Sequence, residues 1–477
     1  MPASLYFFIA LAGLLAGYFV YGTFVEKVFG ADPKRATPVC RMADGVDFVE
    51  MKPWKVFLIQ LLNIAGLGPV FGPILGALYG PTALLWVVFG SIFAGAVHDY
   101  FSGMLSIRYN GASIPEAVGY NLGNTIRQIM RVFSVVLLVL VGVVFVAGPA
   151  GLLANLTGVD AMVFVAIIFA YYFIATVLPV DKIIGTVYPF FAVLLVFMAV
   201  GLVSMLFIKG YDFYPAAQWV NQHPAGLPIF PMVFITIACG AVSGFHATQS
   251  PMMARCIANE KYGRPVFYGA MIAEGVIGLI WVTLGMSFFP DPAALAAVLG
   301  PKGNAALVVN NISVSLLGGF GGALAILGVV VLPVTSGDTA FRSARLTIAD
   351  IFGYDQRPNR NRLSIAVPLF VIGVALNFIP FGILWRYFGW ANQTLAAIVL
   401  WTGAAYLLHR GRFHWVATLP AMFMTAVSVS YICFEKSMGF GMPYQMANIV
   451  AVVITVICAA ALLTKGRNRL ASEPADS

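Results

Sequence analysis

The chain has 477 residues, of which 60% are hydrophobic and only 10% are charged, and its mean hydropathy is +0.91. Because so few charges cannot cover a soluble surface of this size, the composition predicts an all-α, polytopic membrane protein. The formal net charge is +8, but the basic residues lie in short clusters between apolar runs. This distribution is typical of cytoplasmic loops, so we expect a lipid bilayer and not nucleic acid as the partner.

The cysteines and the absence of catalytic motifs exclude several classes of protein. An odd number of cysteines, without CxxC or the Cys/His spacing of a metal site, predicts neither a full disulfide framework nor a bound metal. The chain has no P-loop, GxSxG or HExxH motif, so neither an enzyme nor a primary pump is predicted. We expect no cofactor beyond a coupling ion, H⁺ or Na⁺. The cysteines, predicted to be small buried hydrophobes, are Cys40, Cys239, Cys256, Cys433 and Cys458.

A window of roughly 20 residues predicts about 13 transmembrane helices in a single domain. The first run, Leu5 to Val25, has no preceding basic residue and no clear A-x-A site, so it is interpreted as a retained helix and not a signal peptide. The predicted spans are about 4–25, 54–78, 82–107, 127–150, 161–178, 185–208, 229–250, 265–289, 315–336, 363–381, 390–408, 413–433 and 445–464. Within residues 1–477, we expect an extra N-terminal helix (4–25), a core (54–408), two extra C-terminal helices (413–464) and a cytoplasmic tail (465–477).

The distribution of basic residues predicts the orientation of the chain. An odd number of spans places the two termini on opposite sides of the membrane. If the N-terminus lies outside, all but four of the 27 Lys and Arg residues fall in cytoplasmic segments, as the positive-inside rule requires. The four exceptions are Lys209, Lys302, Arg386 and Lys436.

The predicted span 54–78 is unusual because small and helix-breaking residues lie at its middle. They are Gly66, Gly68, Pro69, Gly72 and Pro73. A break at membrane depth is tolerated only where it is packed in protein or lines a wet cavity. We therefore predict a broken helix whose residues Gly66 to Pro73 offer mainly backbone groups to a substrate.

The predicted span 229–250 is interrupted in a similar way, and its break adds polar side chains. We predict that the GFHATQ segment is unwound and that His246 faces the substrate cavity. The alternatives are that the glycines of both breaks only allow close helix packing and that His246 is a satisfied core residue. The predicted substrate-binding residues of this second break are Gly240, Ser243, Gly244, His246, Thr248 and Gln249.

The two interrupted spans are five spans apart and run in opposite directions. This is the pattern of inverted-repeat transporters, in which the binding site lies between the two repeats. The N–H and C=O groups freed at such breaks bind an anionic group and a cation, respectively.

Few ionisable residues lie at membrane depth, where charges are costly and indicate function. His98 and Asp99 lie toward the inner end of a span and form either a proton relay or a structural pair. Glu274 stands alone among apolar residues in AMIAEGVIGL. It is predicted either to carry a proton or to be a hydrogen-bonded structural carboxylate.

The ninth span ends in PVTSGDTAFRSAR, which carries two kinds of ion-coupling candidate. The hydroxyls of Thr335 and Ser336, opposite free carbonyls at a helix break, are predicted to form an oxygen-lined cation site; the alternative is back-bonding within their own helix. Asp338 lies four residues before Arg342 and seven before Arg345. A structural salt bridge and a role in ion coupling are equally compatible with this spacing.

The eleventh span begins with WRYFGWANQT, which contains Trp385, Trp390, Asn392 and Gln393. This segment is predicted to be either an external aromatic gate or part of the interfacial aromatic belt.

Long segments of this chain resemble the carbon starvation (CstA) family of bacterial inner-membrane proteins. The sequence is similar to a short form, since longer members continue past the point where this chain ends. The segments that carry the resemblance are GLGPVFGPILGALYG (66–80), GAVHDYFSGMLSIRYNGASIPE (95–116), SGFHATQSP (243–251), LPVTSGDTAFRSAR (332–345) and WRYFGWANQTLA (385–396).

The resemblance implies a transporter of the amino acid–polyamine–organocation group with a LeuT-like core of two inverted five-helix repeats, here spans two to eleven. It further implies uptake of peptides, amino acids or pyruvate under nutrient limitation, by proton- or cation-coupled symport. No substrate-specificity residue is implied.

The sequence therefore favours a secondary active importer that works by alternating access. The competing class is a channel or a nutrient sensor without coupled transport. A channel would show a flux that neither saturates nor needs an ion gradient, and a sensor would be expected to carry an appended signalling domain. Nothing in the sequence specifies the oligomeric state.

Overall fold

The computed structural model describes residues 3–45, 47–177, 180–212, 220–300, 303–356 and 358–470, and it describes no side chains for residues 3, 177, 180–189 and 465–470. Two basic residues of the predicted orientation, Lys302 and Arg357, and part of the predicted tail, residues 471–477, lie outside the described residues. So do the side chains of Lys182, Lys465, Arg467 and Arg469.

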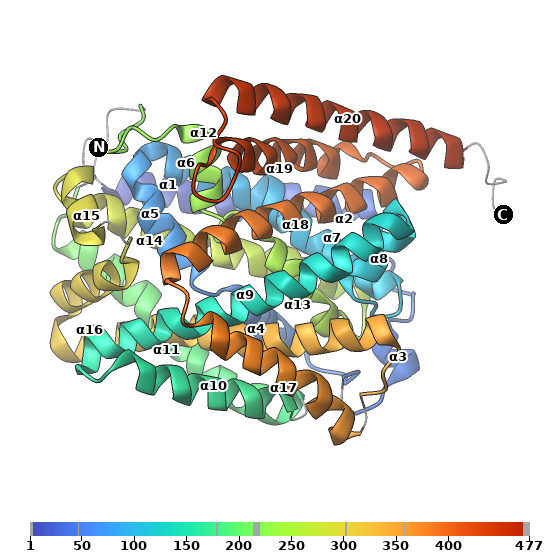
Figure 1. Ribbon diagram of the computed structural model, residues 1–477, viewed down its shortest axis with the longest axis horizontal. Helices are drawn as coiled ribbons and strands as arrows, with labels where there is room; N and C mark the ends of the chain where they lie inside the picture. Colours follow the sequence, from blue (N-terminus) through green and yellow to red (C-terminus); the bar gives the residue numbers. More distant parts are fainter. Residues whose placement is uncertain are drawn as a thin grey trace.

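The described part of the chain is built from helices and contains no strand (Figure 1). Its longer helices are joined by short turns, and some contain π-helical or 3₁₀ turns. In chain order the helical elements are α1 Ala3–Ala16, η1 Gly17–Tyr21, α2 Gly22–Phe29, α3 Pro38–Met42, α4 Pro53–Ile64, α5 Gly68–Gly76, η2 Ala77–Tyr79, α6 Pro81–Gly90, η3 Ser91–Gly95, α7 Ala96–Arg108, α8 Ile114–Leu122, α9 Asn124–Thr157, α10 Ala161–Val177, α11 Val180–Ile208, α12 Ile229–Thr236, α13 Gly244–Ala254, η4 Glu260–Tyr262, η5 Arg264–Tyr268, α14 Gly269–Phe288, α15 Pro292–Leu299, α16 Ala305–Phe352, α17 Asn359–Leu376, α18 Phe381–His409, α19 Trp415–Phe434 and α20 Tyr444–Leu470.

Many of these helices are long and apolar enough to cross a membrane, which confirms the predicted multi-pass membrane protein. Within the described residues, nine helices satisfy this test, and the bent pair α4 and α5 makes a tenth. The exact number of 13 spans stays a prediction.

The first predicted break is present between α4 and α5, whose axes differ by 49°. Only residues 65–67 are non-helical, so the break is shorter than predicted. Gly68, Pro69, Gly72 and Pro73 lie inside α5. Pro69 is tolerated there because the first turn of a helix does not need its N–H.

The second predicted break is also present, but it lies earlier in the chain than predicted. Helix α12 ends at Thr236, residues 237–243 are non-helical, and α13 begins at Gly244. The prediction that GFHATQ is unwound is therefore wrong, since Gly244, His246, Thr248 and Gln249 all lie on α13. The unwinding instead centres on Gly240, whose φ of 85° a glycine adopts without steric cost.

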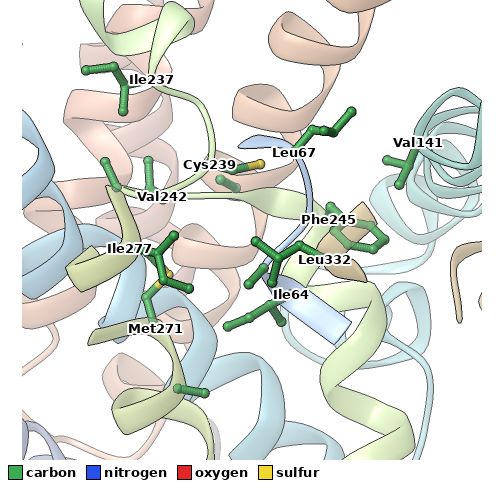
Figure 2. Close-up of a cluster of buried hydrophobic side chains, with 14 of the residues drawn as sticks. Ile64, Leu67, Val141, Ile237, Cys239, Val242, Phe245, Met271, Ile277 and Leu332 are labelled. Carbon is green, nitrogen blue, oxygen red and sulfur yellow. The ribbon is translucent and has the colours of Figure 1, made fainter. Parts of the chain in front are cut away.

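The two breaks pack directly against each other. A Cβ atom on Gly68 would lie only 1.9 Å from the Cβ of Cys239, and one on Gly72 would lie 2.9 Å from the carbonyl oxygen of Thr236. Figure 2 shows Leu67 of the first break near Cys239 of the second, with apolar side chains of the neighbouring helices around them. The glycines thus allow close packing between the two broken helices.

The broken helices occupy the centre of the molecule. Helix α13 packs against α4, α7 and α18, and α14 packs against α4 and α5, while the long helix α16 contacts both α9 and α11. In Figure 1, α19 and α20 form one edge of the bundle and α10 and α17 the opposite edge. Helix α1 begins at the end where α15 lies, whereas α20 ends toward the side of α3.

Candidate functional site

A chain of four titratable side chains crosses the centre of the bundle. His98 Nδ1 lies 2.8 Å from Asp99 Oδ1, and His246 Nδ1 lies 2.9 Å from Asp99 Oδ2. On the other side of the imidazole, His246 Nε2 forms an ion pair with Glu274 Oε2 at 3.3 Å. All four side chains are fully buried, with 0% of their surface exposed.

Three different helices supply this chain. His98 and Asp99 come from the first turn of α7, just after the π-helical turn η3, and Glu274 from the second turn of α14. His246 is in the first turn of α13, directly after the second break. Both nitrogens of His246 therefore face carboxylates, and the prediction that Glu274 stands alone is wrong in space, although it is correct along the sequence.

Glu274 also links the titratable chain to the second break. Its carboxylate lies beside the backbone of Gly240. One turn further along α14, a Cβ atom on Gly278 would lie 3.2 Å from the carbonyl oxygen of Gly240. A charge on Glu274 therefore lies against the unwound backbone of the second break.

Asn392 of α18 holds the start of α13 in place. Its Oδ1 accepts hydrogen bonds from the backbone N–H of Phe245 (2.7 Å) and from the hydroxyl of Ser243 (3.1 Å). Gln393 donates from Nε2 to the carbonyl oxygens of Phe234 and Ala238, at 2.8 and 3.4 Å. The two amides thus satisfy backbone groups that the second break frees.

This role of Asn392 and Gln393 differs from the predicted gate or belt. Both side chains are fully buried, whereas belt residues lie at the membrane interface. Burial of two adjacent amides within an apolar helix costs free energy unless the amides are hydrogen-bonded. The Asn–Gln pair was therefore the sequence signal for an internal role.

Thr335 and Ser336 lie on α16 and converge on the end of α4. Their hydroxyls donate to the carbonyl oxygen of Leu62 at 2.7 and 3.1 Å, and both also bond carbonyls of their own helix. The carbonyl of Leu62 is one of the last of α4, which has no partner in the next turn because α4 ends at Ile64. Three oxygen atoms therefore meet beside the first break.

Asp338, one turn beyond these hydroxyls, accepts a hydrogen bond from the Tyr171 hydroxyl at 2.8 Å. The Arg342 guanidinium donates to the carbonyl oxygen of Ala175, and that of Arg345 to the side chain of Gln356. Asp338 is almost fully buried. Its hydrogen-bond partner, Tyr171, belongs to α10 and is not part of the chain that contains His246.

Polar side chains continue from the second break along α13. Ser250 accepts from Ser102 of α7 at 3.0 Å and from Gln60 of α4 at 3.4 Å. Gln249 donates to the hydroxyl of Thr248 at 3.0 Å, and the backbone carbonyl of Thr248 accepts from Ser343 of α16. The interface of α13 with α4, α7 and α16 is thus polar, unlike the apolar contact between the breaks.

Aromatic rings form a continuous row near the breaks, in which neighbouring rings are tilted or edge-to-face. Successive ring centroids of Phe71, Trp385, Phe388, Phe145 and Phe245 lie 5.5 to 6.0 Å apart. Phe71 and Trp385 also line a cavity of about 750 Å³ at the starts of α16 and α18. The row therefore extends from this cavity to Phe245 in the first turn of α13.

The family model "Carbon starvation protein CstA" matches residues 3–154, 146–316 and 301–431. The chain belongs to the carbon starvation protein CstA family. It is 47% identical over 61% of its length to an uncharacterized membrane protein of Haemophilus influenzae, of which the match covers 93%. It is 25% identical to the peptide transporter CstA of Campylobacter jejuni, with 94% of this chain and 82% of that protein covered.

A further relative of this CstA family member is the pyruvate/proton symporter BtsT of Escherichia coli. It is 28% identical over 56% of this chain and 46% of that protein. Two transporters are among the solved structures of similar fold. A manganese transporter of Eremococcus coleocola has a TM-score of 0.56 at 11% identity, with 90% of this chain and 99% of that chain covered. The nucleobase-cation-symport-1 family transporter Mhp1 has a TM-score of 0.50 at 14% identity, with 89% and 96% covered.

Proposed function

We propose that this protein is a secondary active transporter that imports a small organic nutrient, a peptide, an amino acid or pyruvate, by proton- or cation-coupled symport. The observation that carries the proposal is the contact between two broken helices at residues 65–67 and 237–243. Breaks at the centre of a membrane bundle are the usual binding elements of secondary transporters. The names of the relatives, peptide transporters and a pyruvate/proton symporter, support the substrate classes.

The proposed mechanism is alternating access around the two breaks. The breaks are in contact and the aromatic row lies next to them, so a substrate enters only after these contacts separate. Ser243 at the second break, with Thr248 and Gln249 on α13, supplies polar groups for recognition, and Gly66 to Pro73 supplies backbone groups. The polar interface of α13 with α4 and α16 is then the path of release.

Two places suit a coupling ion. The hydroxyls of Thr335 and Ser336 meet the Leu62 carbonyl beside the first break, an arrangement of oxygen ligands that suits a hard cation. The chain from His98 to Glu274 contains groups that bind protons. The protein is proposed to lie in a bacterial cytoplasmic membrane as one domain with two inverted five-helix repeats, its N-terminus outside and its C-terminus in the cytoplasm.

Uptake into proteoliposomes tests the proposal. Purified protein is reconstituted and offered labelled pyruvate or a labelled dipeptide under an imposed proton or sodium gradient. We expect saturable accumulation of at least one substrate that depends on a gradient. Failure of both substrates under every gradient would reject symport, and a flux that neither saturates nor needs a gradient would indicate a channel.

A further inference from the structure

The titratable chain defined by His98, Asp99, His246 and Glu274 has a charge that does not balance. When both carboxylates are ionised and one imidazole is protonated, the chain carries one net negative charge. A net charge fully buried at membrane depth is expensive. One additional proton removes this charge, and Glu274 at the end of the chain is the carboxylate with a single imidazole neighbour.

We propose that these four side chains form the proton-binding unit of the transporter and that it carries one proton per transport cycle. This inference rests on the proposed symport and deepens it by assigning the coupling ion to named residues. The proton binds the Glu274 carboxylate, passes along His246 and Asp99, and leaves from His98. No other covalent bond forms or breaks.

The surroundings of His246 are consistent with a unit that binds one proton. Asp99 and His98 face it from α7, Glu274 from α14, and Cys239 from the second break. The other helices that pack against α13 present uncharged groups there among the described residues. These are Gln60 of α4, Ser343 of α16 and Asn392 of α18.

The arrangement also gives the proton an exit and a means of coupling. The second ring nitrogen of His98 is buried and has no hydrogen-bond partner among the described residues. Since Glu274 lies beside Gly240, loading the proton removes a charge from the edge of the second break, where the substrate is proposed to bind.

The test separates proton coupling from substrate transport. The protein is reconstituted with the membrane potential clamped at zero, and the substrate accumulated by the wild type is measured against an imposed pH difference. A coupling of one proton per substrate predicts accumulation of about tenfold per pH unit, since one unit corresponds to a tenfold ratio. Accumulation of about one hundredfold, or none in a wild type that exchanges substrate, would overturn the inference.

Glu274→Gln keeps the shape of the side chain but cannot release a proton. We expect this variant to exchange labelled for unlabelled substrate and to lose pH-driven accumulation, and Asp99→Asn to lose it as well. The matched control is Asp160→Asn, because Asp160 is an exposed carboxylate just before α10 that accepts a hydrogen bond from the N–H of Met162.

Wild-type accumulation by Glu274→Gln would overturn the assignment while leaving symport intact. If Glu274→Gln does not fold, the wild-type ratio still decides the stoichiometry. A wild type that moves neither substrate would instead reject the proposed function.

Discussion

Single residues decide how closely the two broken helices approach. Gly68 and Gly240 contact residues from the opposite break, and any side chain at these positions would enter the space that Cys239 or Pro69 occupies. The predicted choice between substrate contact and close packing thus has a clear geometric answer for Gly68, Gly72 and Gly240 in this structure, in which they pack. A role in binding for their backbone groups requires the breaks to separate.

Gly68→Ala should destabilise the protein and impair transport, because the new methyl group would overlap Cys239. Overpacking of a well-packed core typically costs about 1–3 kcal/mol. Thermal unfolding of the purified protein and uptake into proteoliposomes measure the two effects. Gly319→Ala is the control, since a Cβ there meets no atom within 4 Å. Equal behaviour of the two variants would show that the breaks do not pack as described.

At the scale of elements, polar side chains on neighbouring helices complete the broken ones. α18 satisfies the second break through Asn392 and Gln393, and α16 satisfies the end of α4 through Thr335 and Ser336. Each broken helix is therefore tied to a neighbouring helix at the point where its own hydrogen bonds stop. Movement of one helix against the other must exchange these bonds for others.

Asn392→Ala should loosen the start of α13. The variant removes the acceptor of the Phe245 N–H, and loss of an N-terminal cap typically costs about 0.5–2 kcal/mol. We expect a lower melting temperature and slower uptake. Asn377→Ala provides the comparison, because Asn377 is half-buried at the end of α17 and bonds only weakly to Gly373 at 3.4 Å. An unchanged Asn392→Ala protein would contradict the capping role.

Replacing Thr335 by Val and Ser336 by Ala together should leave the Leu62 carbonyl without its two hydroxyl donors. A buried acceptor without a partner costs about 1–3 kcal/mol, so the melting temperature should fall. Any dependence of uptake on sodium should also disappear, because the oxygen ligands are lost. Thr464→Val, which removes only bonds to the carbonyls of Ala460 and Ala461 on an exposed helix face, should leave both unchanged. Sodium dependence that survives in the double variant would remove this pair from ion coupling.

At the scale of the whole molecule, the remaining question is which end of the bundle faces the cytoplasm. The prediction of buried cysteines is wrong for Cys40, which is exposed, whereas Cys239, Cys256 and Cys433 are buried and Cys458 is half-buried. Cys40 follows the first helix in a segment that the charge distribution places inside. It therefore reports orientation without an engineered probe.

A membrane-impermeant maleimide should label the wild-type protein in inverted vesicles but not in intact cells. Cys40→Ser should abolish this labelling. Lys436→Cys, introduced into the Cys40→Ser protein, places a thiol at an exposed position that is predicted to lie outside, and it should be labelled in intact cells. Labelling of both positions from one side would refute the predicted orientation.

The sequence by itself determined the class of the protein, its family and the existence of the two broken helices. These features are local. The composition of a helix decides whether it lies in lipid or in water, and glycine with proline interrupts a helix wherever that helix lies. The exact unwound residues were less predictable: Gly244 to Gln249 form a helix because Asn392, 147 residues after Phe245 in the chain, caps it.

Only the tertiary structure decided which buried charges meet. His98 and Asp99 were predicted as a pair and Glu274 as a lone carboxylate, because their neighbours in sequence are apolar. The packing of α7, α13 and α14 around the second break brings them together through His246. Such contacts depend on the relative placement of three helices, which the pattern along any one of them does not contain.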